Sequence, residues 1–587
     1  MTNALGFVLC AMQKSEKNSK VRNRKSGKDV PFYDNYVYFC PLESEKLRIC
    51  DLKTIFMKRL FLFLMVCVQV AIVAAEKNTK VLNADDYKHY IERFNQDDEN
   101  LYVQYIPNES AWSFLEQNIP LFDCPDEEVK TTYYFRWWTF RKHIKQTPTG
   151  FIISEFLPSV DWSEKYNSIA CAAAHHIYEG RWLRDTRYID SYARFWFTEG
   201  NPRMYSFWAS NALWEYYKVT RSKMVPELLP SLIENYQAWE KGWMRHGHFI
   251  GRNPDGLFST YDDRDGMEMQ IGGSGKRPTI NSYMYGDAVA ISEMAALWGQ
   301  QAVAEEYKAK AGELRQLVEN SLWDASASFF KTRSEKDNQL VAVRELQGYT
   351  PWYVNLPTPG KGYEQAWAFM GSHEGFNAPY GLTTSEQSCP DFKLVYEGHE
   401  CQWNGPVWPF STSVTLTALA NVLNNYEQST ISVHDYFEQF MKYTRSHRRV
   451  CEDGRILPWI DENMNPYTGD WISRTRLESW ENGTWSDSKG GRERGKDYNH
   501  STYCDLLISG LVGIRPQSES ALVIHPLIPA HAWDWFCLDG VSYQGHVLTV
   551  LYDRTGTRYQ QGQGFIILVD GKVKWHSKDM QEVHLDL

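Results

Sequence analysis

Apolar positions recur every three to four residues through much of the chain from Ser110 to Ile514, a pattern that predicts successive helices. The apolar side chains between Met284 and Trp298 keep a 3.6-residue period, and the same period resumes between Val303 and Leu322. Only Gly299 and its nearest neighbours separate the two stretches. We therefore expect two helices packed against each other as a hairpin.

Similar pairs are predicted elsewhere in this region. One runs over 206–219 and, after Pro226, on to Glu240, and another joins 412–423 to 433–444, while an earlier pair is expected between Trp112 and Lys145. Each hairpin buries its apolar stripe only against its neighbours. About six such pairs predict a mainly α protein, an (α/α)6 toroid of helical hairpins whose connections at one rim carry the chemistry.

After Arg515 the period changes from 3.6 to two. Alternating stretches cover Ala521–His525, Val541–Tyr552 and Gly564–Trp575, and Asp570-Gly571 in the last of them is typical of a hairpin turn. We expect a small C-terminal antiparallel β-domain over residues 516–587, with a structural role against the toroid.

The apolar run Leu60–Ala75, introduced by Met57-Lys58-Arg59, has the form of a secretory signal peptide over 57–75. We expect residues 1–56 to be a non-native or disordered upstream extension. Residues 76–109 then form a lead-in segment and 110–515 the catalytic toroid. This predicts a secreted or periplasmic protein that leaves the membrane after signal cleavage. The alternative is that the run stays as a single anchoring helix.

Composition narrows the function. Tyr, Phe and Trp make up 15% of the 587 residues, and flat aromatic faces suit sugar rings as well as a core. The net charge of −11 argues against a nucleic-acid partner. The sequence has no phosphate-binding loop, dinucleotide fingerprint, HExxH or GxSxG motif. We expect no cofactor and derive no metal site, although loop oxygens leave a structural calcium ion open.

Several loops between the predicted helices combine carboxylates with aromatic residues, namely 179–185, 262–268 and 459–469. A glycosidic bond is cleaved by two carboxyl groups, one protonated to assist the leaving oxygen and one ionised to activate water or attack carbon. Two acids on separate loops above one pocket would supply both roles.

Five short elements occur in the order expected for one family, and together they span residues 180 to 510. They are Trp182-Leu183-Arg184-Asp185, Gly266-Met267-Glu268, Pro379-Tyr380-Gly381-Leu382, Gly405-Pro406-Val407-Trp408-Pro409 and Glu462-Asn463-Met464-Asn465-Pro466-Tyr467-Thr468-Gly469. This set resembles glycoside hydrolase family 63 and the mannosylglycerate-hydrolase-like enzymes, which belong to the six-hairpin glycosidases.

The resemblance implies an inverting mechanism in which Glu268 is the general acid and Glu462 the general base. Glu268 stands where family 63 has Asp, and Met269 follows where that family has Asn, so Asp265 remains an alternative acid. As general acid, Glu268 needs a raised pKa, which the negative charge of Asp265 could supply.

Glu478 and Glu481 remain alternatives to Glu462 as the base. The resemblance also implies substrate-binding residues, with Arg184 and Asp185 holding sugar hydroxyls and the tryptophans forming walls. The residues expected to contact the sugar are Trp182, Arg184, Asp185, Trp403, Asn404 and Trp408.

The leading function is an exported, exo-acting glycoside hydrolase that removes a terminal α-linked sugar, such as a glucoside or mannoside, from an oligosaccharide or glycoside. One alternative is a polysaccharide lyase on a similar toroid, using His175-His176 or His500 with Tyr503. Another is a sugar-binding protein without catalysis. The oligomeric state is not indicated by the sequence.

Overall fold

The computed structural model describes residues 80–394, 402–451, 453–472 and 494–587. The predicted upstream extension and signal peptide lie outside these residues, as do Glu478 and Glu481. Within the described part of the chain, no helix has the length and apolar character needed to cross a membrane.

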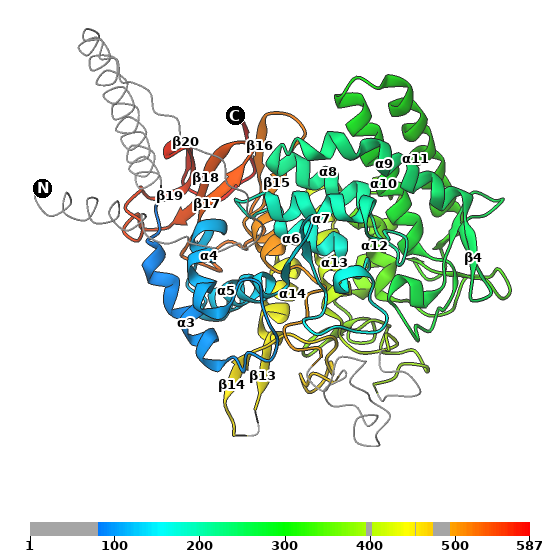
Figure 1. The fold of residues 1–587 in the computed structure, drawn as a ribbon, viewed down its shortest axis with the longest axis horizontal. Helices are drawn as coiled ribbons and strands as arrows, with labels where there is room; N and C mark the ends of the chain where they lie inside the picture. Colours follow the sequence, from blue (N-terminus) through cyan, green and yellow to red (C-terminus); the bar gives the residue numbers. More distant parts are fainter. Residues whose placement is uncertain (1–79, 395–401, 452, 473–493) are drawn as a thin grey trace, which may run out of the picture. The chain divides into compact units, whose positions relative to one another are not determined.

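A ring of inner helices forms the centre of the fold (Figure 1). Along the chain, each inner helix contacts the next one. The inner helices are α6 (Ala173–Gly180), α8 (Ala209–Thr220), α10 (Pro278–Leu297), α12 (Thr350–Tyr353), α13 (Pro409–Asn425) and η8 (Leu506–Leu511), the last with π-type hydrogen bonds. The predicted (α/α)6 toroid is therefore confirmed.

Glu179, at the end of α6, joins the first inner helix to the last. Its carboxylate accepts hydrogen bonds from the backbone N–H groups of Tyr503 at 3.2 Å, Cys504 at 2.9 Å and Asp505 at 2.8 Å. These are N–H groups at the start of a helix, which have no partner within the helix itself. The ring is thus closed by a side chain that lies more than 300 residues upstream in the chain.

Outer helices pack around this ring. They are α5 (Glu127–Lys142), α7 (Arg187–Thr198), α9 (Met224–Lys241), α11 (Gln301–Ser321) and α14 (Val433–Ser446). The pairs α8–α9, α10–α11 and α13–α14 confirm three predicted hairpins. In α11 only one stripe of side chains is buried, whereas α10 is buried on nearly all sides, as its inner position requires.

The pair of helices expected between Trp112 and Lys145 is present, with a short strand between them that was not predicted. Helices α4 (Ala111–Asn118) and α5 are present, but β1 (Leu121–Asp123) lies between them and pairs with β17 (Trp535–Tyr543). A three-residue strand leaves too short an alternating pattern to be recognised in the sequence. The C-terminal β region therefore takes one strand from the N-terminal part of the chain.

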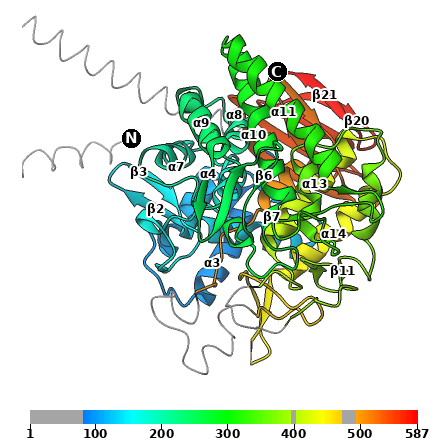
Figure 2. The same ribbon diagram turned by 90° about the vertical axis from the view of Figure 1, so that its right-hand side faces the viewer.

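The C-terminal strands form two antiparallel sheets, ordered β1-β17-β18-β19-β20 and β15-β16-β21. Figure 2 shows β20 and β21 on the opposite side of the view from β2 and β3. The remaining strands of these sheets are β15 (Ile514–Pro516), β16 (Ala521–Ile524), β18 (His546–Asp553), β19 (Gly564–Val569), β20 (Lys572–Ser577) and β21 (Val583–Asp586).

Tight turns determine how neighbouring strands of the C-terminal sheets pair. The predicted turn at Asp570-Gly571 is confirmed, since both residues have positive φ, 51° and 73°, and join β19 to β20. The stretch Val541–Tyr552 is not one strand, because Gln544 and Gly545 also have positive φ and form a second hairpin turn between β17 and β18.

Short elements fill the connections between the long helices. The helical ones are η1 (Ala84–Tyr87), α3 (Lys88–Asp97), η2 (Asn108–Ser110), η3 (Lys165–Asn167), η4 (Asp262–Asp265), η5 (Leu346–Tyr349) and η6 (Tyr363–Phe369). The strands are β2 (Ile144–Thr147), β3 (Gly150–Ile153), β4 (Trp243–Arg245), β5 (His248–Arg252), β6 (Phe258–Ser259), β7 (Gly275–Lys276), β8 (Trp323–Asp324), β9 (Phe329–Phe330), β10 (Arg333–Ser334), β11 (Asn377–Ala378), β12 (Gly381–Leu382), β13 (Arg448–Val450) and β14 (Ile456–Pro458).

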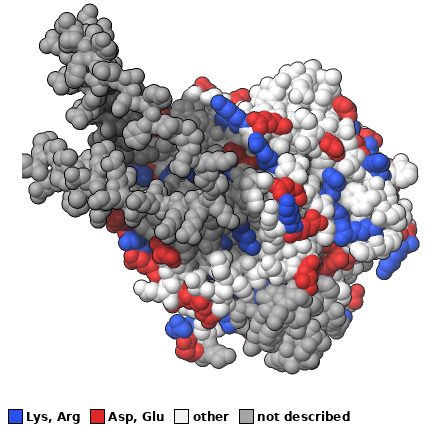
Figure 3. Space-filling view, in the orientation of Figure 1, with Lys and Arg blue, Asp and Glu red and all other residues white. Residues whose placement is uncertain are grey.

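Charged side chains of both signs are interspersed over the face shown in Figure 3, where the described residues form no continuous basic band.

Candidate active site

One cavity brings Glu268 and Glu462 together, although 193 positions separate them in the sequence. Connections from several parts of the ring line it, and most of the lining side chains are aromatic. The lining residues are Glu155, Phe156, Trp162, Ile169, Cys171, Tyr205, Gly266, Glu268, Trp403, Trp408, Phe410, Glu462, Tyr498 and His500.

The loop that carries Glu268 follows η4 through a tight turn. Gly266 there has a φ of 67°, and a Cβ at this position would lie 2.5 Å from the Cys171 sulfur. Only glycine fits both constraints. The Gly-Met-Glu element therefore places Met267 in the core, 2% exposed, and lets the next side chain reach the cavity.

Trp403 positions Glu268 through two hydrogen bonds. Its backbone N–H donates to the Glu268 carbonyl oxygen at 3.1 Å, and its indole Nε1–H donates to Oε2 of the carboxylate at 3.0 Å. The second bond fixes which way the carboxyl group faces.

The Gly-Pro-x-Trp element builds one wall of the cavity. Trp403 stacks on Trp408 with ring centroids 4.1 Å apart, and Trp408 stacks on Phe410 at 4.5 Å. Both tryptophans line the cavity, where the sequence predicted an aromatic wall. The wall offers an apolar surface to a sugar ring.

Glu462 is held to the same wall by backbone bonds. Val407 and Met464 exchange two hydrogen bonds, of 2.9 and 3.0 Å, so the Gly-Pro-x-Trp and Glu-Asn-Met-Asn segments run side by side. The Asn465 side chain accepts from the N–H groups of Tyr467 and Thr468, which closes the turn before Gly469. The Glu462 side chain is 3% exposed.

Three further polar side chains in the cavity were not predicted. Glu155 follows strand β3, Tyr205 precedes α8, and Tyr498 lies near the start of the last described segment, 494–587. The Tyr498 hydroxyl hydrogen-bonds Glu155 and lies 3.4 Å from Oε1 of Glu462. None of the three belongs to a motif, so the sequence alone offered no signal for them.

Asp265 does not line the cavity, which corrects its placement as an alternative acid. Its carboxylate is buried against Arg277, with Nε 2.6 Å from Oδ2, and it also accepts from the hydroxyls of Ser206 and Thr279. With these partners Asp265 is a structural anion that holds the Glu268 loop on α10.

Three predicted sugar-binding residues of the 182–185 segment also lie away from the cavity. Trp182 is 0% exposed, and its Nε1–H donates to Asp505 at 2.6 Å. Arg184 donates to the carbonyl oxygens of Gly540, Glu116 and Gln117. Asp185 accepts from the backbone and guanidinium of Arg187 at the start of α7. The segment joins structural elements, and its residues are not among those that line the cavity.

Asn404 is buried next to the wall but is not among the lining residues. Its carbonyl oxygen accepts from Lys393 N–H at 3.0 Å. Asn404 therefore supports the loop that carries Trp403.

Among the residues proposed for a lyase, only His500 lines the cavity. His175 packs between Trp208 and Phe410, and burial lowers its pKa to about 3. Burial lowers the pKa of His176 to about 4. Tyr503 is fully buried, its hydroxyl hydrogen-bonds that of Thr444, and burial raises its pKa. The His175-His176 and Tyr503 side chains are part of the core.

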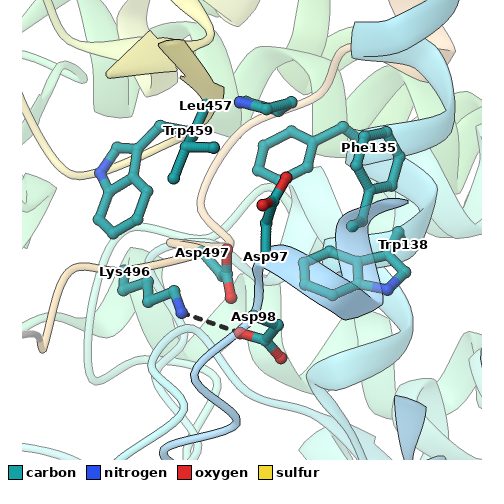
Figure 4. A pocket seen from close by; sticks show the side chains of 10 residues that line it. Asp97, Asp98, Phe135, Trp138, Leu457, Trp459, Lys496 and Asp497 are labelled. Carbon is teal, nitrogen blue, oxygen red and sulfur yellow. Dashed lines mark hydrogen bonds and ion pairs between the residues drawn. The ribbon is translucent and has the colours of Figure 1, made fainter. Parts of the chain in front are cut away.

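A second hollow lies beside the segment that leads to Tyr498 (Figure 4). Its floor holds Asp98 and Asp497 with Lys496, whose Nζ is 2.8 Å from Asp98. Lys142 pairs with both aspartates at 2.9 and 2.6 Å. Burial opposes ionisation of Asp98, but the two lysines hold its pKa well below the usual value. This charge cluster anchors the chain just before Tyr498.

Residues 165–501 match the family described as the mannosylglycerate hydrolase MGH1-like glycoside hydrolase domain. The chain belongs to this MGH1-like glycoside hydrolase family. The match covers Glu268, Glu462 and the aromatic wall. Residues 514–574 match the C-terminal domain of glycosyl hydrolase family 65.

Solved structures and curated proteins resemble this MGH1-like hydrolase to different extents. A structure named sialidase is 42% identical with a TM-score of 0.78, and the match covers 86% of this chain and 44% of that one. A GH63 mannosylglycerate hydrolase from Thermus thermophilus, in complex with Tris and D-glycerate, is 12% identical with a TM-score of 0.45, covering 64% of this chain and 100% of that one.

An uncharacterized protein of Borreliella burgdorferi is 21% identical over 272 residues. That match covers 44% of this chain and 53% of the relative. The chain thus spans about half the length of the curated relative and of the sialidase.

Proposed function

We propose that this glycoside hydrolase acts on a chain end and inverts the anomeric carbon, with Glu268 as general acid and Glu462 as general base. The observation that supports the proposal most is that both side chains line one aromatic-walled cavity. They come from separate segments, so each can have its own environment, as the two roles require.

In the proposed reaction Glu268 donates its proton to the departing glycosidic oxygen. Glu462 takes a proton from a water molecule, which attacks the anomeric carbon from the opposite face. Inversion needs roughly 6.5 to 9.5 Å between the two carboxyl groups so that water fits. The hydrogen bond from Trp403 Nε1 to Oε2 of Glu268 orients the acid for this transfer.

The carboxylates that line the cavity bear on the choice of substrate. A terminal α-linked glucoside, mannoside or related sugar remains our proposal for the substrate. Glu155, Glu268 and Glu462 all face the cavity, so a neutral sugar suits it better than one with a carboxylate.

The name of the sialidase structure does not argue for sialic acid here. More than half of that chain has no counterpart in this one, and the activity in its name belongs to the whole protein. A sialic acid would also bring its carboxylate close to the three glutamates.

Export and the domain limits are further proposals. The signal-like segment 57–75 supports a secreted or periplasmic location, and residues 110–515 and 516–587 are proposed as toroid and β-domain after a lead-in segment at 76–109.

The test begins with the chain from Glu76 onwards and a panel of nitrophenyl α- and β-glycosides. Glu268→Gln and Glu462→Gln should each lower kcat by about 10²–10⁴-fold while binding, measured by calorimetry, is retained. Glu374→Gln, at an exposed glutamate outside the cavity, is the matched control and should be fully active.

Proton NMR of the first product tests the stereochemistry. Release of the inverted anomer supports the proposed water geometry, whereas early release of the retained anomer contradicts it. Full turnover by either glutamine variant would contradict the catalytic assignment, and activity only on β-glycosides would contradict the α-linkage.

A further inference from the structure

Glu462 shares the Tyr498 hydroxyl with a third carboxylate, that of Glu155. Tyr498 OH hydrogen-bonds Oε1 of Glu155 and lies 3.4 Å from Oε1 of Glu462. All three residues are at most 5% exposed and line the same cavity. A phenol has one proton to donate, so it donates fully to only one of two carboxylates at a time.

The position of Tyr498 is fixed from several sides. Its ring packs on Phe156 and His500, with centroids 4.8 and 3.8 Å away. The next residue, Asn499, donates its backbone N–H to the Glu155 carbonyl oxygen at 3.1 Å. The Lys142–Asp497 ion pair holds the chain on the other side. The hydroxyl therefore stays between the two carboxylates.

Glu155 is fixed equally well. It follows β3, and the Asn167 side chain holds the chain beyond it by donating to the carbonyl oxygens of Phe156 and Pro158, at 3.1 and 2.8 Å. Such a well-supported carboxylate beside the general base is not needed to break a glycosidic bond, which takes two carboxyl groups.

We propose that Glu155 and Tyr498 are positioning residues that set when Glu462 is ionised and where its carboxylate points. This inference rests on the proposed role of Glu462 as general base. Neither residue is assigned a contact with the substrate.

The mechanism follows from charge and hydrogen bonding. With Glu155 ionised, Tyr498 donates to Glu155, and Glu462 feels a like charge with little help from the phenol. A neighbouring negative charge raises the pKa of a carboxyl group, and a donated hydrogen bond lowers it. A raised pKa makes Glu462 a stronger base at neutral pH.

Other titratable groups face the same cavity and contribute to its field. In the described lining they are Glu155, Cys171, Tyr205, Glu268, Tyr498 and His500, with Asp461 next to Glu462 in the chain. Arg494 lies 4.5 Å from the Trp162 ring centroid and 5.7 Å from that of Phe156. Apart from Glu155 and Tyr498, these groups are unchanged in the variants below, so differences between variants isolate the Glu155–Tyr498 pair.

The two substitutions have opposite expected effects. Glu155→Gln removes the like charge and frees the phenol proton for Glu462, so the pKa of Glu462 should fall by about one unit. Tyr498→Phe removes the proton that screens the charge of Glu155, so Glu462 faces an unscreened carboxylate and its pKa should rise. Glu155→Asp keeps the charge and should stay close to the wild type.

Carbon-13 NMR of the full chain labelled with [δ-¹³C]glutamate measures this directly and needs no substrate. The Glu462 signal is the one that disappears in Glu462→Gln. Opposite shifts of its titration midpoint in Glu155→Gln and Tyr498→Phe support the proposal. Unchanged midpoints, or shifts in the same direction, overturn it.

Kinetics provide the second measurement on a glycoside that the panel identifies. The acidic limb of kcat/KM against pH should move to lower pH in Glu155→Gln and to higher pH in Tyr498→Phe, because only the ionised base is active. A purely structural role would lower activity and thermal stability without moving the limb. Full activity of Glu462→Gln would contradict the assignment of Glu462 as the general base. The NMR midpoints report separately whether Glu155 and Tyr498 change the pKa of Glu462, so the two failures can be told apart.

Discussion

Arg277 illustrates how burial makes a single residue structurally essential. Its side chain and that of Asp265 are almost fully shielded from solvent, and the pair ties the Glu268 loop to the first turn of α10. Removing one partner leaves an uncompensated buried charge. Burial thus explains why an acid three positions from Glu268 has a structural role.

We predict that Arg277→Met lowers the free energy of unfolding by about 3–5 kcal/mol, because Asp265 would remain buried without its cation. Urea titration followed by circular dichroism measures the change. Arg187→Met is the matched control, since the Arg187–Asp185 pair is largely exposed and its loss should leave stability unchanged. Equal effects of the two substitutions on the free energy of unfolding would contradict the structural role of the buried Arg277–Asp265 pair.

At the residue scale, the sequence led to Glu268, Glu462 and Trp408 because each sits in a short motif, and Trp403 lies two residues before one. It did not predict Glu155 or Tyr498, which reach the cavity only through the folded connections. Arg184 was expected to hold a sugar hydroxyl, whereas its side chain donates to backbone carbonyl oxygens in the structure. A sequence pattern of Arg and Asp beside Trp does not distinguish these two partners.

Neighbouring inner helices are joined by side chains at their ends. Helix α8 has no hydrogen bond from its own N-cap residue, Trp208. Asp287 of α10 provides the missing acceptor, because its carboxyl oxygen accepts a hydrogen bond from the backbone N–H of Asn211 at 2.9 Å. Burial raises the pKa of Asp287 to about 8, although the backbone hydrogen bonds oppose that shift.

This raised pKa predicts a pH-dependent stability. The folded chain keeps the Asp287 proton up to about pH 8, whereas the unfolded chain loses it near pH 4, so folding binds a proton between these values. Stability should therefore fall as pH rises through this window, with a contribution of about 1.4 kcal/mol per pH unit.

Asp287→Asn keeps an oxygen acceptor but cannot titrate. Unfolding curves of the wild type and this variant, recorded at intervals from pH 4 to 8, should therefore converge toward the acidic end and diverge toward pH 8, where the variant is more stable. A constant difference across the window would mean that Asp287 does not titrate there.

The sequence predicted the long helices better than the short helices and strands. Long amphipathic helices such as α11 carry their period over many turns, so their positions could be read from the sequence. The inner helix α12 has four residues and β1 has three, and neither is long enough to show a period. Their conformation depends on the neighbours they contact.

At the scale of the whole molecule, the helical ring and the C-terminal sheet are joined by specific contacts. Strand β1 pairs with β17, and Arg184 donates to the Gly540 carbonyl oxygen at 2.8 Å. Gly540 has a φ of 78° in the irregular part of β17, and a Cβ there would lie 2.6 Å from the Arg184 guanidinium. The positive φ at this position favours glycine, and the absence of a Cβ leaves room for the guanidinium.

We predict that Arg184→Ala lowers the thermal unfolding midpoint but leaves KM unchanged on the glycoside identified by the panel, because Arg184 lies away from the cavity. Differential scanning calorimetry and steady-state kinetics provide the two values. The alternative, that Arg184 holds a sugar hydroxyl, predicts a higher KM at unchanged stability.

The closure of the ring by Glu179 has a consequence for biosynthesis. The three N–H groups that this carboxylate accepts are made 324 to 326 residues after it. At 5–20 residues per second, a ribosome needs roughly 16 to 65 seconds to add them. Throughout that interval the nascent chain holds a glutamate without its final partners, and the last inner helix docks only when synthesis is nearly complete.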